Sequence, residues 1–334
     1  MESRSLEEDR GAPRKRVVVI DDGYGSYETE QRILAAVNAD VVVLPCRGDA
    51  ARVREVAADA DALLVRESPV NAAAIAAMQR CRAIVRYGIG VDNVDLDAAR
   101  DKRIYVVNVP DYGVEEVSDQ ALALLMAVAR YTVRRDGAVR AGAWNVSREQ
   151  KMYRIAGRTL GLVGYGRIAR AFERKMRGMG VARVLVYDPF LDPAKTPGVE
   201  CVDLDTLCAE SDYISLHSPL TPDTRKLINA ARLARMKPTT ILVNTARGGL
   251  IDEAALIDAL QRRAIFGAGL DVFENEPPRA DHPLFACENA VLSDHTGWYS
   301  EDSVAELQTK AAQEVARVLG GDQPKHWVNP WSAV

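Results

Sequence analysis

Three charged residues follow closely after apolar, β-branched runs in the second half of the chain. Arg247 comes after "TILVN", Glu276 after "FGAGLDV" and His295 after "AVLSD". A 2-keto acid needs a cation for its carboxylate and carbonyl, a proton donor for its oxygen, and a carboxylate that keeps this donor charged. Arg247, His295 and Glu276 fit those roles in that order. The alternatives are a buried ion pair for Arg247 and a loop carboxylate for Glu276.

A glycine-rich segment, "TLGLVGYGRIAR" at 159–170, precedes these residues. Gly164, Gly166 and Ala169 have the spacing of a dinucleotide-binding turn between a strand and a helix. Asp188 lies 24 residues after Gly164 and follows the next apolar run. A carboxylate there accepts hydrogen bonds from both hydroxyls of an adenine ribose and repels a 2′-phosphate, whereas Arg167 is better placed for the pyrophosphate. The segment predicts NAD(H) rather than NADP(H); a tight turn without a ligand is the alternative.

Two series of short apolar runs, separated by helical segments, must position these residues. The first series is "RVVVID", "DVVVL", "DALLV", "AIVRY" and "IYVVNV"; the second is "TLGLVG", "RVLVYD", "YISLH", "TILVN", "FGAGLDV" and "AVLSD". Unbroken apolar strands that alternate with helices indicate parallel sheets covered on both faces. Between the two series, residues 113–135 contain no proline or internal glycine and predict one long helix. The segment "SEDSVAELQTKAAQEVARVLGG" predicts a further helix that ends at Gly320 and Gly321.

The glycine motif lies in the middle of the chain, so we expect a nucleotide domain inserted into another domain. The predicted fold class is α/β, with two doubly wound, Rossmann-like parallel-sheet domains, of which the substrate domain is flavodoxin-like. We expect residues 14–112 and 298–334 to form the substrate domain and residues 113–297 the NAD-binding domain. The chain would cross between them near 110–114 and 295–300. Ligands bind beyond the carboxyl ends of parallel strands, so two such sheets predict a cleft between them.

Composition excludes several classes of function. The chain has 334 residues, a formal net charge of −4 and 48% hydrophobic residues, which argues against direct binding to nucleic acid. It has no apolar run of the roughly 18 residues that a membrane helix needs, and its polar start lacks a signal-peptide core. We therefore expect a cytoplasmic protein with a frayed N-terminus and no membrane partner. Its five cysteines are scattered, which predicts reduced, buried thiols and no metal site.

The combination of "GYGRIA", "LHSPLTPDT", "NTARGGLID" and "DVFENEP" resembles the D-isomer-specific 2-hydroxyacid dehydrogenase family, from about residue 16 to 330. The resemblance implies a cofactor, NAD, and a small-molecule anionic substrate. It implies that NAD contacts come from the following residues: Gly164, Gly166, Arg167, Ile168, Asp188, His217, Ser218, Pro219, Thr224, Thr245, Ala246, Arg247, Asp271, His295 and Gly297. For His217 we favour the cofactor wall over catalysis, and Asp271 could equally support its strand end.

The same resemblance implies a substrate site at "RYGIG", where Arg86, Tyr87, Gly88, Ile89 and Gly90 cradle a carboxylate with the loop backbone. Arg86 could instead form a salt bridge. Trp298 either lines this pocket or serves only in packing.

Within the family, "IVRYGIGVDNVD", "NVPDYGVEEVSD" and "HTGWYSE" most resemble the C-terminal-binding-protein branch. That branch also has an arginine at the position of Arg86 and a tryptophan at the position of Trp298. Ala169 replaces the commoner third glycine, and Thr296 and Gly297 replace that branch's usual pair of alanines. The resemblance implies a homodimer formed through helix 113–135 and its neighbours.

The function predicted is hydride transfer between NAD and C2 of a D-2-hydroxy acid or 2-keto acid, with His295 as general acid and base. One alternative is an NAD(H)-responsive, corepressor-like binding protein. Another is a dehydrogenase that acts on phosphite or a hydroxyphosphonate. His282 and His326 fit surface or otherwise satisfied residues better than catalysts.

Overall fold

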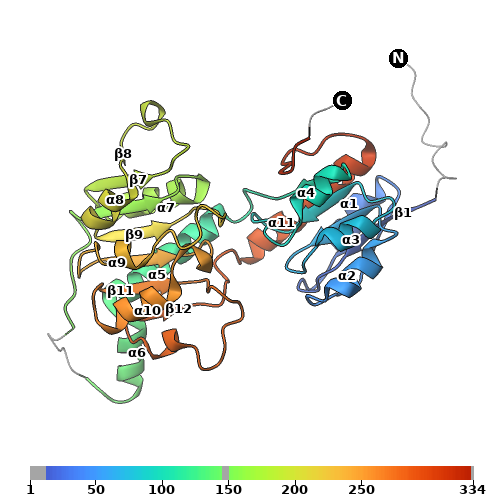
Figure 1. Cartoon of the computed structure of the whole chain (residues 1–334). Helices are drawn as coiled ribbons and strands as arrows, with labels where there is room; N and C mark the ends of the chain where they lie inside the picture. The colour runs from blue at the N-terminus through green and yellow to red at the C-terminus, as the bar shows by residue number, and fades with distance from the viewer. Residues whose placement is uncertain (1–12, 145–149, 332–334) are drawn as a thin grey trace. The chain divides into compact units, whose positions relative to one another are not determined.

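The computed structural model describes residues 13–144 and 150–331 of the chain. The polar start, expected to be frayed, lies mostly outside these residues. Contacts divide the chain into two compact units (Figure 1). Unit 1 comprises Met1–Tyr112 and Ser300–Val334, and unit 2 comprises Gly113–Tyr299.

Unit 1 is built on a five-stranded parallel sheet in the order β2-β1-β3-β4-β5. Its strands are β1 (Lys15–Val19), β2 (Ala39–Val43), β3 (Ala62–Val65), β4 (Ala83–Arg86) and β5 (Tyr105–Val107). Each matches a run of the first series. β3 is buried along its whole length, as expected for a sheet covered on both faces.

Helices cover both faces of this sheet. On one face, α2 (Ala50–Ala57), α3 (Ala72–Ala77) and α4 (Leu96–Asp101) enclose an apolar core with β1, β3 and β4. On the other face, α11 (Glu301–Gly320) packs on α1 (Glu28–Ala35) and on β4, and Figure 1 shows the red α11 beside the blue N-terminal elements. A capping box of Ser300 and Ser303 begins α11, and Gly321 ends it in the left-handed conformation. The predicted C-terminal helix is therefore confirmed.

Unit 2 contains a seven-stranded parallel sheet in the order β12-β11-β10-β9-β6-β7-β8. Its strands are β6 (Thr159–Val163), β7 (Arg183–Tyr187), β8 (Glu200–Cys201), β9 (Tyr213–Leu216), β10 (Ile241–Asn244), β11 (Gly267–Leu270) and β12 (Ala290–Leu292). All but β8 match the second series. β8 has two exposed residues, so no apolar run marks it in the sequence. The order reverses between β6 and β9, which creates a switch point where ligands of such sheets bind.

Helices also cover both faces of the second sheet. One core lies between the sheet, α5 (Val114–Arg130) and α7 (Arg167–Gly178); the other lies under α8 (Leu204–Glu210), α9 (Ala230–Leu233) and α10 (Glu253–Gln261). Short 3-10 turns occupy Pro193–Lys195, Gly248–Leu250 and Pro283–Ala286. Two doubly wound parallel-sheet units confirm the predicted fold class.

The prediction of one continuous helix over 113–135 is wrong at its end. Helix α5 stops at Arg130, Tyr131 adopts the left-handed conformation with φ 53°, and α6 (Thr132–Arg140) follows. The Tyr131 ring packs on Phe266 with centroids 5.5 Å apart, and α6 has no buried residue that would hold it in line with α5. No glycine or proline marks this break, so the sequence pattern could not locate it.

The five cysteines are free, but they are not all buried as expected. Cys46, Cys208 and Cys287 are buried, Cys81 is half-buried, and Cys201 is exposed on the short edge strand β8. Among the described residues, no helix has the length and apolar character needed to cross a membrane.

Candidate active site and cofactor site

The glycine turn lies at the switch point of the unit 2 sheet, between β6 and α7. Gly164 has φ +85°, and a Cβ there would lie 2.8 Å from Ser218 Oγ and 2.9 Å from the His217 carbonyl carbon. Only glycine fits this position, because both the backbone conformation and the space exclude a side chain. A Cβ on Gly166, at the start of α7, would meet nothing within 4 Å, so this helix N-terminus opens to a ligand. Ala169 is fully buried where α7 packs on the sheet.

Asp188 follows β7, and its carboxylate is fixed beside the glycine turn. Its Oδ2 accepts a hydrogen bond from Tyr165 N at 2.9 Å, and its Oδ1 accepts one from Phe190 N at 2.9 Å. The side chain is half-buried and therefore reachable from solvent. This placement suits a carboxylate that receives ribose hydroxyls next to a pyrophosphate turn.

Polar groups at the ends of β9 and β10 form the neighbouring wall. His217 Nε2 and Thr245 Oγ1 are enclosed and have no hydrogen-bond partner among the described residues. Burial lowers the pKa of His217 to about 3, so its ring is neutral. Thr224 Oγ1 donates to Pro219 O at 2.7 Å and orders the loop between them. Buried polar atoms rarely lack a partner, so these two are candidates for contact with a bound ligand.

Arg247 is positioned by the turn after β10. Asn244 Nδ2 donates to Arg247 O at 2.8 Å, and the Arg247 guanidinium donates to Ala246 O at 2.8 Å. The space for a Cβ on the next residue, Gly248, is filled by the Phe273 backbone. The absence of that side chain brings the Arg247 turn against the loop that carries Glu276.

His295 and Glu276 form a close pair, with 2.6 Å between His295 Nδ1 and Glu276 Oε2. The other Glu276 oxygen accepts a hydrogen bond from Phe273 N at 2.9 Å. The two side chains are 39% and 34% exposed, so a small molecule can reach them. Partial burial raises the pKa of Glu276, but the His295 hydrogen bond and the charges of His295 and Arg247 outweigh it, and the pKa is lowered.

Asp271 organises the loop that carries His295. Its carbonyl accepts the His295 N–H at 2.8 Å, and its carboxylate accepts Ser293 Oγ at 2.6 Å, Thr296 N at 3.2 Å and Gly297 N at 2.9 Å. A Cβ on Gly297 would lie 2.7 Å from Asp271 Oδ2, so the glycine lets this loop lie close to the carboxylate. Burial raises the pKa of Asp271, although these hydrogen bonds act in the opposite direction. These contacts show that Asp271 supports the end of its strand, which is the alternative role that the sequence left open for it.

The residues expected to hold the substrate carboxylate follow β4 in unit 1. The Tyr87 side chain points into the core, where its hydroxyl donates to Glu30 Oε1 at 2.7 Å, so only its backbone can serve a ligand. Gly88 O accepts Val109 N at 2.9 Å, and Ile89 O accepts Asn108 Nδ2 at 2.7 Å. Trp298, in unit 2, packs edge-on against Tyr299 with ring centroids 5.8 Å apart.

Comparison with known proteins identifies the family of this chain. Residues 122–297 match the model described as D-isomer specific 2-hydroxyacid dehydrogenase, NAD binding domain. The chain is 42% identical over 277 residues to a glyoxylate reductase of Korarchaeum cryptofilum, which covers 81% of this chain and 83% of that protein. The chain belongs to the D-isomer specific 2-hydroxyacid dehydrogenase family.

Two further similarities support this assignment. The chain is 39% identical over 275 residues to a D-3-phosphoglycerate dehydrogenase of Methanocaldococcus jannaschii; the match covers 81% of this chain but only 52% of that longer protein. The structure of D-lactate dehydrogenase from Aquifex aeolicus, complexed with NAD and lactic acid, matches with a TM-score of 0.85 and 26% identity, over 95% of this chain and 100% of that one. As a family member, the chain is an NAD-dependent oxidoreductase for D-2-hydroxy acids.

The described residues of this dehydrogenase fit NAD on structural grounds. The α7 N-terminus is open at Gly166, a carboxylate stands at the end of β7, and two enclosed polar atoms lack protein partners. In the part of the chain that the structure describes, no cluster of three His, Cys, Asp or Glu side chains could hold a metal ion.

The dehydrogenase contains a second histidine–glutamate pair, which the sequence did not indicate and which positions a loop. His282 Nε2 lies 3.0 Å from Glu253 Oε1, and the other Glu253 oxygen accepts Glu274 N at 3.1 Å. His282 is thus a satisfied residue, as expected, but it also braces the loop of Glu276. The sequence contains no signal for this pair, because the two residues are 29 positions apart on unrelated elements.

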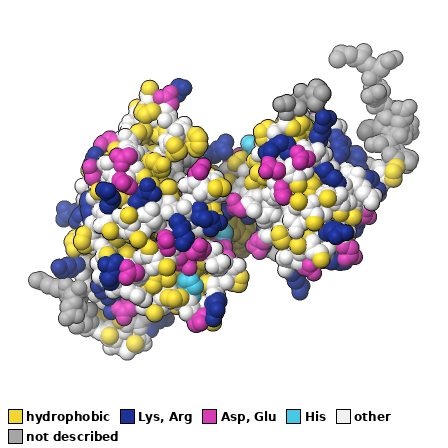
Figure 2. Space-filling model, in the orientation of Figure 1, with side chains coloured by type: hydrophobic (Ala, Val, Ile, Leu, Met, Phe, Trp, Pro, Cys, Tyr) yellow, Lys and Arg dark blue, Asp and Glu magenta, His cyan; other side chains and the backbone are white. Residues whose placement is uncertain are grey.

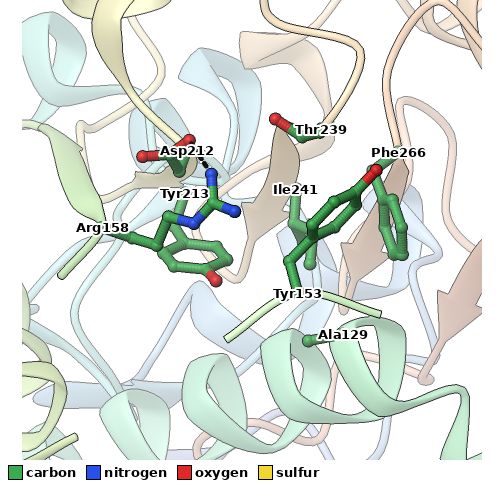
Figure 3. A pocket seen from close by; sticks show the side chains of 8 residues that line it. All are labelled: Ala129, Tyr153, Arg158, Asp212, Tyr213, Thr239, Ile241 and Phe266. Atoms are coloured by element: carbon green, nitrogen blue, oxygen red, sulfur yellow. Dashed lines mark hydrogen bonds and ion pairs between the residues drawn. The ribbon is translucent and has the colours of Figure 1, made fainter. Parts of the chain in front are cut away.

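A small cavity of unit 2 lies near the amino ends of its strands. Figure 3 shows Tyr153, Arg158, Asp212 and Phe266 around it, with Arg158 and Asp212 paired at 3.1 Å. These residues precede strands rather than follow them, and the cavity holds about 10 Å³. It has room for about one water molecule and is not a substrate site.

Charged side chains of both signs are interspersed on the face of the dehydrogenase shown in Figure 2. Such mixing on this face, with the net charge of −4, differs from the basic stripe of a nucleic-acid-binding protein.

Proposed function

We propose that His295, Glu276 and Arg247 perform the proton transfer in the reduction of a 2-keto acid to a D-2-hydroxy acid. The pair at 2.6 Å, half exposed and beside Arg247, is the observation that carries this proposal. Glu276 binds Nδ1, so Nε2 gives the proton to the substrate oxygen and takes it back in the reverse reaction. Glu276 orients the imidazole and stabilises its charged form. Arg247 binds the carboxylate and polarises the carbonyl.

NADH, when bound, supplies the hydride. We infer that the turn at Gly164 and Gly166, with Arg167 and Ile168, receives its pyrophosphate and that Asp188 holds its ribose. The orphaned His217 Nε2 and Thr245 Oγ1 support a wall of His217, Ser218, Pro219, Thr224, Thr245 and Ala246. Asp271 and Gly297 would border the nicotinamide end while they hold the His295 loop.

For the substrate carboxylate we propose the backbone of the loop from Arg86 to Gly90. The N–H groups of Ile89 and Gly90 donate to no protein acceptor within the described residues, whereas Gly88 N donates to Arg86 O at 2.9 Å. Two adjacent free N–H groups suit an anion. Because a relative is named a glyoxylate reductase, glyoxylate is a suitable first substrate.

The decisive experiment is NADH oxidation followed by absorbance with a panel of 2-keto acids, and with phosphite and 2-hydroxyphosphonates in the reverse direction with NAD. We expect turnover of at least one 2-keto acid, and a D-configured product wherever C2 of the product is a stereocentre. Turnover of phosphite or a hydroxyphosphonate alone would replace the proposed substrate class.

We also propose the domain assignment of residues 14–112 and 298–334 to substrate and 113–297 to NAD. A homodimer formed through α5 and α6 belongs to the same proposal. Val133 and Val139 are 62% and 51% exposed on α6, and a cavity of about 110 Å³ opens beside Ala127, Tyr131 and Ala290. Measurement of the molecular mass in solution tests the proposed dimer, because the mass of a monomer would contradict it.

Within the family, we propose that the chain lies nearest the C-terminal-binding-protein branch. Arg86 and Trp298 support this placement. A corepressor-like role would then accompany catalysis, and a pull-down with and without NADH would test it. If no partner is captured either with or without NADH, the result would favour a purely metabolic enzyme.

A further inference from the structure

Two hydrogen bonds join the glycine turn of unit 2 to the end of β7. Gly164 N donates to Tyr187 O at 2.8 Å, and Tyr165 N donates to Asp188 Oδ2 at 2.9 Å. The second bond engages the carboxylate that the proposed function assigns to the adenine ribose. The orientation of the Tyr165 peptide therefore contributes to the orientation of Asp188.

The Tyr165 side chain is held by α7, the helix that begins at the same turn. Its hydroxyl donates to Glu173 Oε2, and the residue is buried. The Arg170 guanidinium lies over the ring, with its central carbon 4.1 Å from the ring centroid. Burial and the Glu173 carboxylate raise the pKa of this phenol to about 12, so it is a neutral donor at neutral pH. The first two turns of α7 thus restrain the ring and, through it, the turn peptide.

The acceptor Glu173 is itself fixed by a second partner. Its side chain is only 11% exposed, and its Oε1 accepts a hydrogen bond from Arg177 Nε at 2.6 Å, one helical turn further along. Arg177 Nη2 donates in turn to Gly198 O, in the segment that precedes β8. A buried carboxylate is costly unless it is hydrogen-bonded, and both oxygens of Glu173 have a partner. Glu173 is therefore a rigid acceptor for the Tyr165 hydroxyl.

The glycine turn does not by itself need a tyrosine at position 165. Gly164 provides the left-handed conformation, and Gly166 keeps the helix N-terminus open, so any residue with a backbone N–H could bond to Asp188. The hydroxyl and its buried acceptor add a further restraint on that N–H. Such support matters in a binding site, because groups that touch a ligand must be held close to their productive geometry.

We propose that Tyr165 and Glu173 are positioning residues for the cofactor, which hold the peptide that orients Asp188 and thereby strengthen the preference for NAD(H) over NADP(H). The role deepens the proposed function and rests on the assignment of Asp188 to the ribose. Neither side chain touches the cofactor. When the hydroxyl bond is removed, Asp188 is held less firmly and its bonds to the ribose hydroxyls weaken. A 2′-phosphate does not use those bonds, so NADPH should be affected less.

The test measures the Kd of NADH and of NADPH by fluorescence titration of the full chain. Tyr165→Phe should weaken NADH about fivefold and leave NADPH within about twofold. Glu173→Gln keeps an amide oxygen that can accept the phenol but loses the charge of the acceptor, so NADH should weaken about threefold. Equal losses for both cofactors, or no change for either, would overturn the assignment of these residues.

A double-mutant cycle with Asp188→Ala separates a positioning role from a merely structural one. If Tyr165 acts through Asp188, Tyr165→Phe should have almost no further effect on NADH affinity once Asp188→Ala is present. A fivefold loss in both backgrounds would mean that Tyr165 supports the turn without acting through Asp188. Failure of the proposed function looks different, because Asp188→Ala alone would then leave both NADH affinity and cofactor preference unchanged.

Two control variants of the same unit match these changes. Tyr213→Phe removes a hydroxyl from a buried tyrosine at the amino end of β9, and Asp258→Asn removes a carboxylate charge that is paired with Arg262 four residues later. Both should bind NADH and NADPH as the wild-type protein does. Thermal unfolding checks that each variant is folded, and the cycle with Glu173→Gln decides the question if Tyr165→Phe does not fold. A loss of NAD preference in either control as large as that in Tyr165→Phe would contradict the proposed role.

Discussion

Unit 2 contains two histidine–glutamate pairs that share their chemistry and differ in access. His295 and Glu276 are 2.6 Å apart with side chains 39% and 34% exposed, whereas His282 and Glu253 are 3.0 Å apart and only 15% and 16% exposed. Both carboxylates also hold the backbone of one loop, through Phe273 N and Glu274 N. In the proposed mechanism the open pair exchanges a proton with the substrate and the enclosed pair braces the loop. Access, rather than residue type, would then separate the catalytic pair from the structural one.

The electrostatics of the open pair agree with this division. The pKa of Glu276 is lowered despite its partial burial, because His295 binds its charged form. A carboxyl group with a lowered pKa stabilises the folded state above its ordinary range near 4.5 and loses that effect as the pH falls through the lowered pKa. Glu276 is therefore ionised throughout the neutral range.

The largest expected effect is that of His295→Gln. The variant lacks the proton carrier but keeps the glycine turn and Asp188, so kcat should fall about 10³-fold while NADH still binds. Steady-state kinetics and NADH fluorescence titration measure the two quantities. Loss of NADH binding would show that His295 is structural and would break the contrast between the pairs.

Glu276→Gln should have the next largest effect, a fall in kcat of about 10- to 100-fold. The variant removes the anion that is paired with His295 Nδ1, so the acid limb of the oxidation profile should shift. The measurement is kcat against pH in the oxidative direction. An unchanged profile would remove Glu276 from the mechanism.

Asp188 lies outside both histidine–glutamate pairs, so Asp188→Ala should change only the preference between NAD and NADP. Withdrawal of the ribose acceptor and of its negative charge should lower the preference for NAD over NADP about tenfold. The ratio of kcat/KM for the two cofactors measures this. If the preference persists, the ribose is recognised elsewhere.

Glu253→Gln should have the smallest effect on catalysis, with kcat within about threefold of the wild-type value. It weakens a partly buried pair worth about 1–2 kcal/mol, so the melting temperature should fall by about 2–8 °C. Calorimetry and steady-state kinetics check both. A loss of activity as large as that of Glu276→Gln would show that the enclosed pair takes part in the chemistry.

The sequence predicted the parts of the molecule that follow from local patterns. Apolar strands, the glycine turn and the C-terminal helix all matched, because burial on both faces, φ > 0 at Gly164 and the cap at Gly321 impose residue types. The break at Tyr131 was not predictable, since it depends on packing against Phe266, 135 positions away.

The candidate site shows the same limit. Residues at strand ends, such as Arg247 and His295, could be found from the order of elements. The inward turn of the Tyr87 side chain toward Glu30 and the bracing of Glu274 by Glu253 depend on distant partners. No local pattern encodes such contacts.

The most direct test of the catalytic assignment is a single-turnover measurement of NADH oxidation. His295→Gln and His282→Gln, each loaded with NADH, are mixed with the preferred 2-keto acid and followed by absorbance. Hydride transfer should be slowed about 10³-fold in His295→Gln and stay within about threefold of the wild-type rate in His282→Gln. Equal slowing of both variants, or a larger effect of His282→Gln, would contradict the assignment of His295 as the proton carrier.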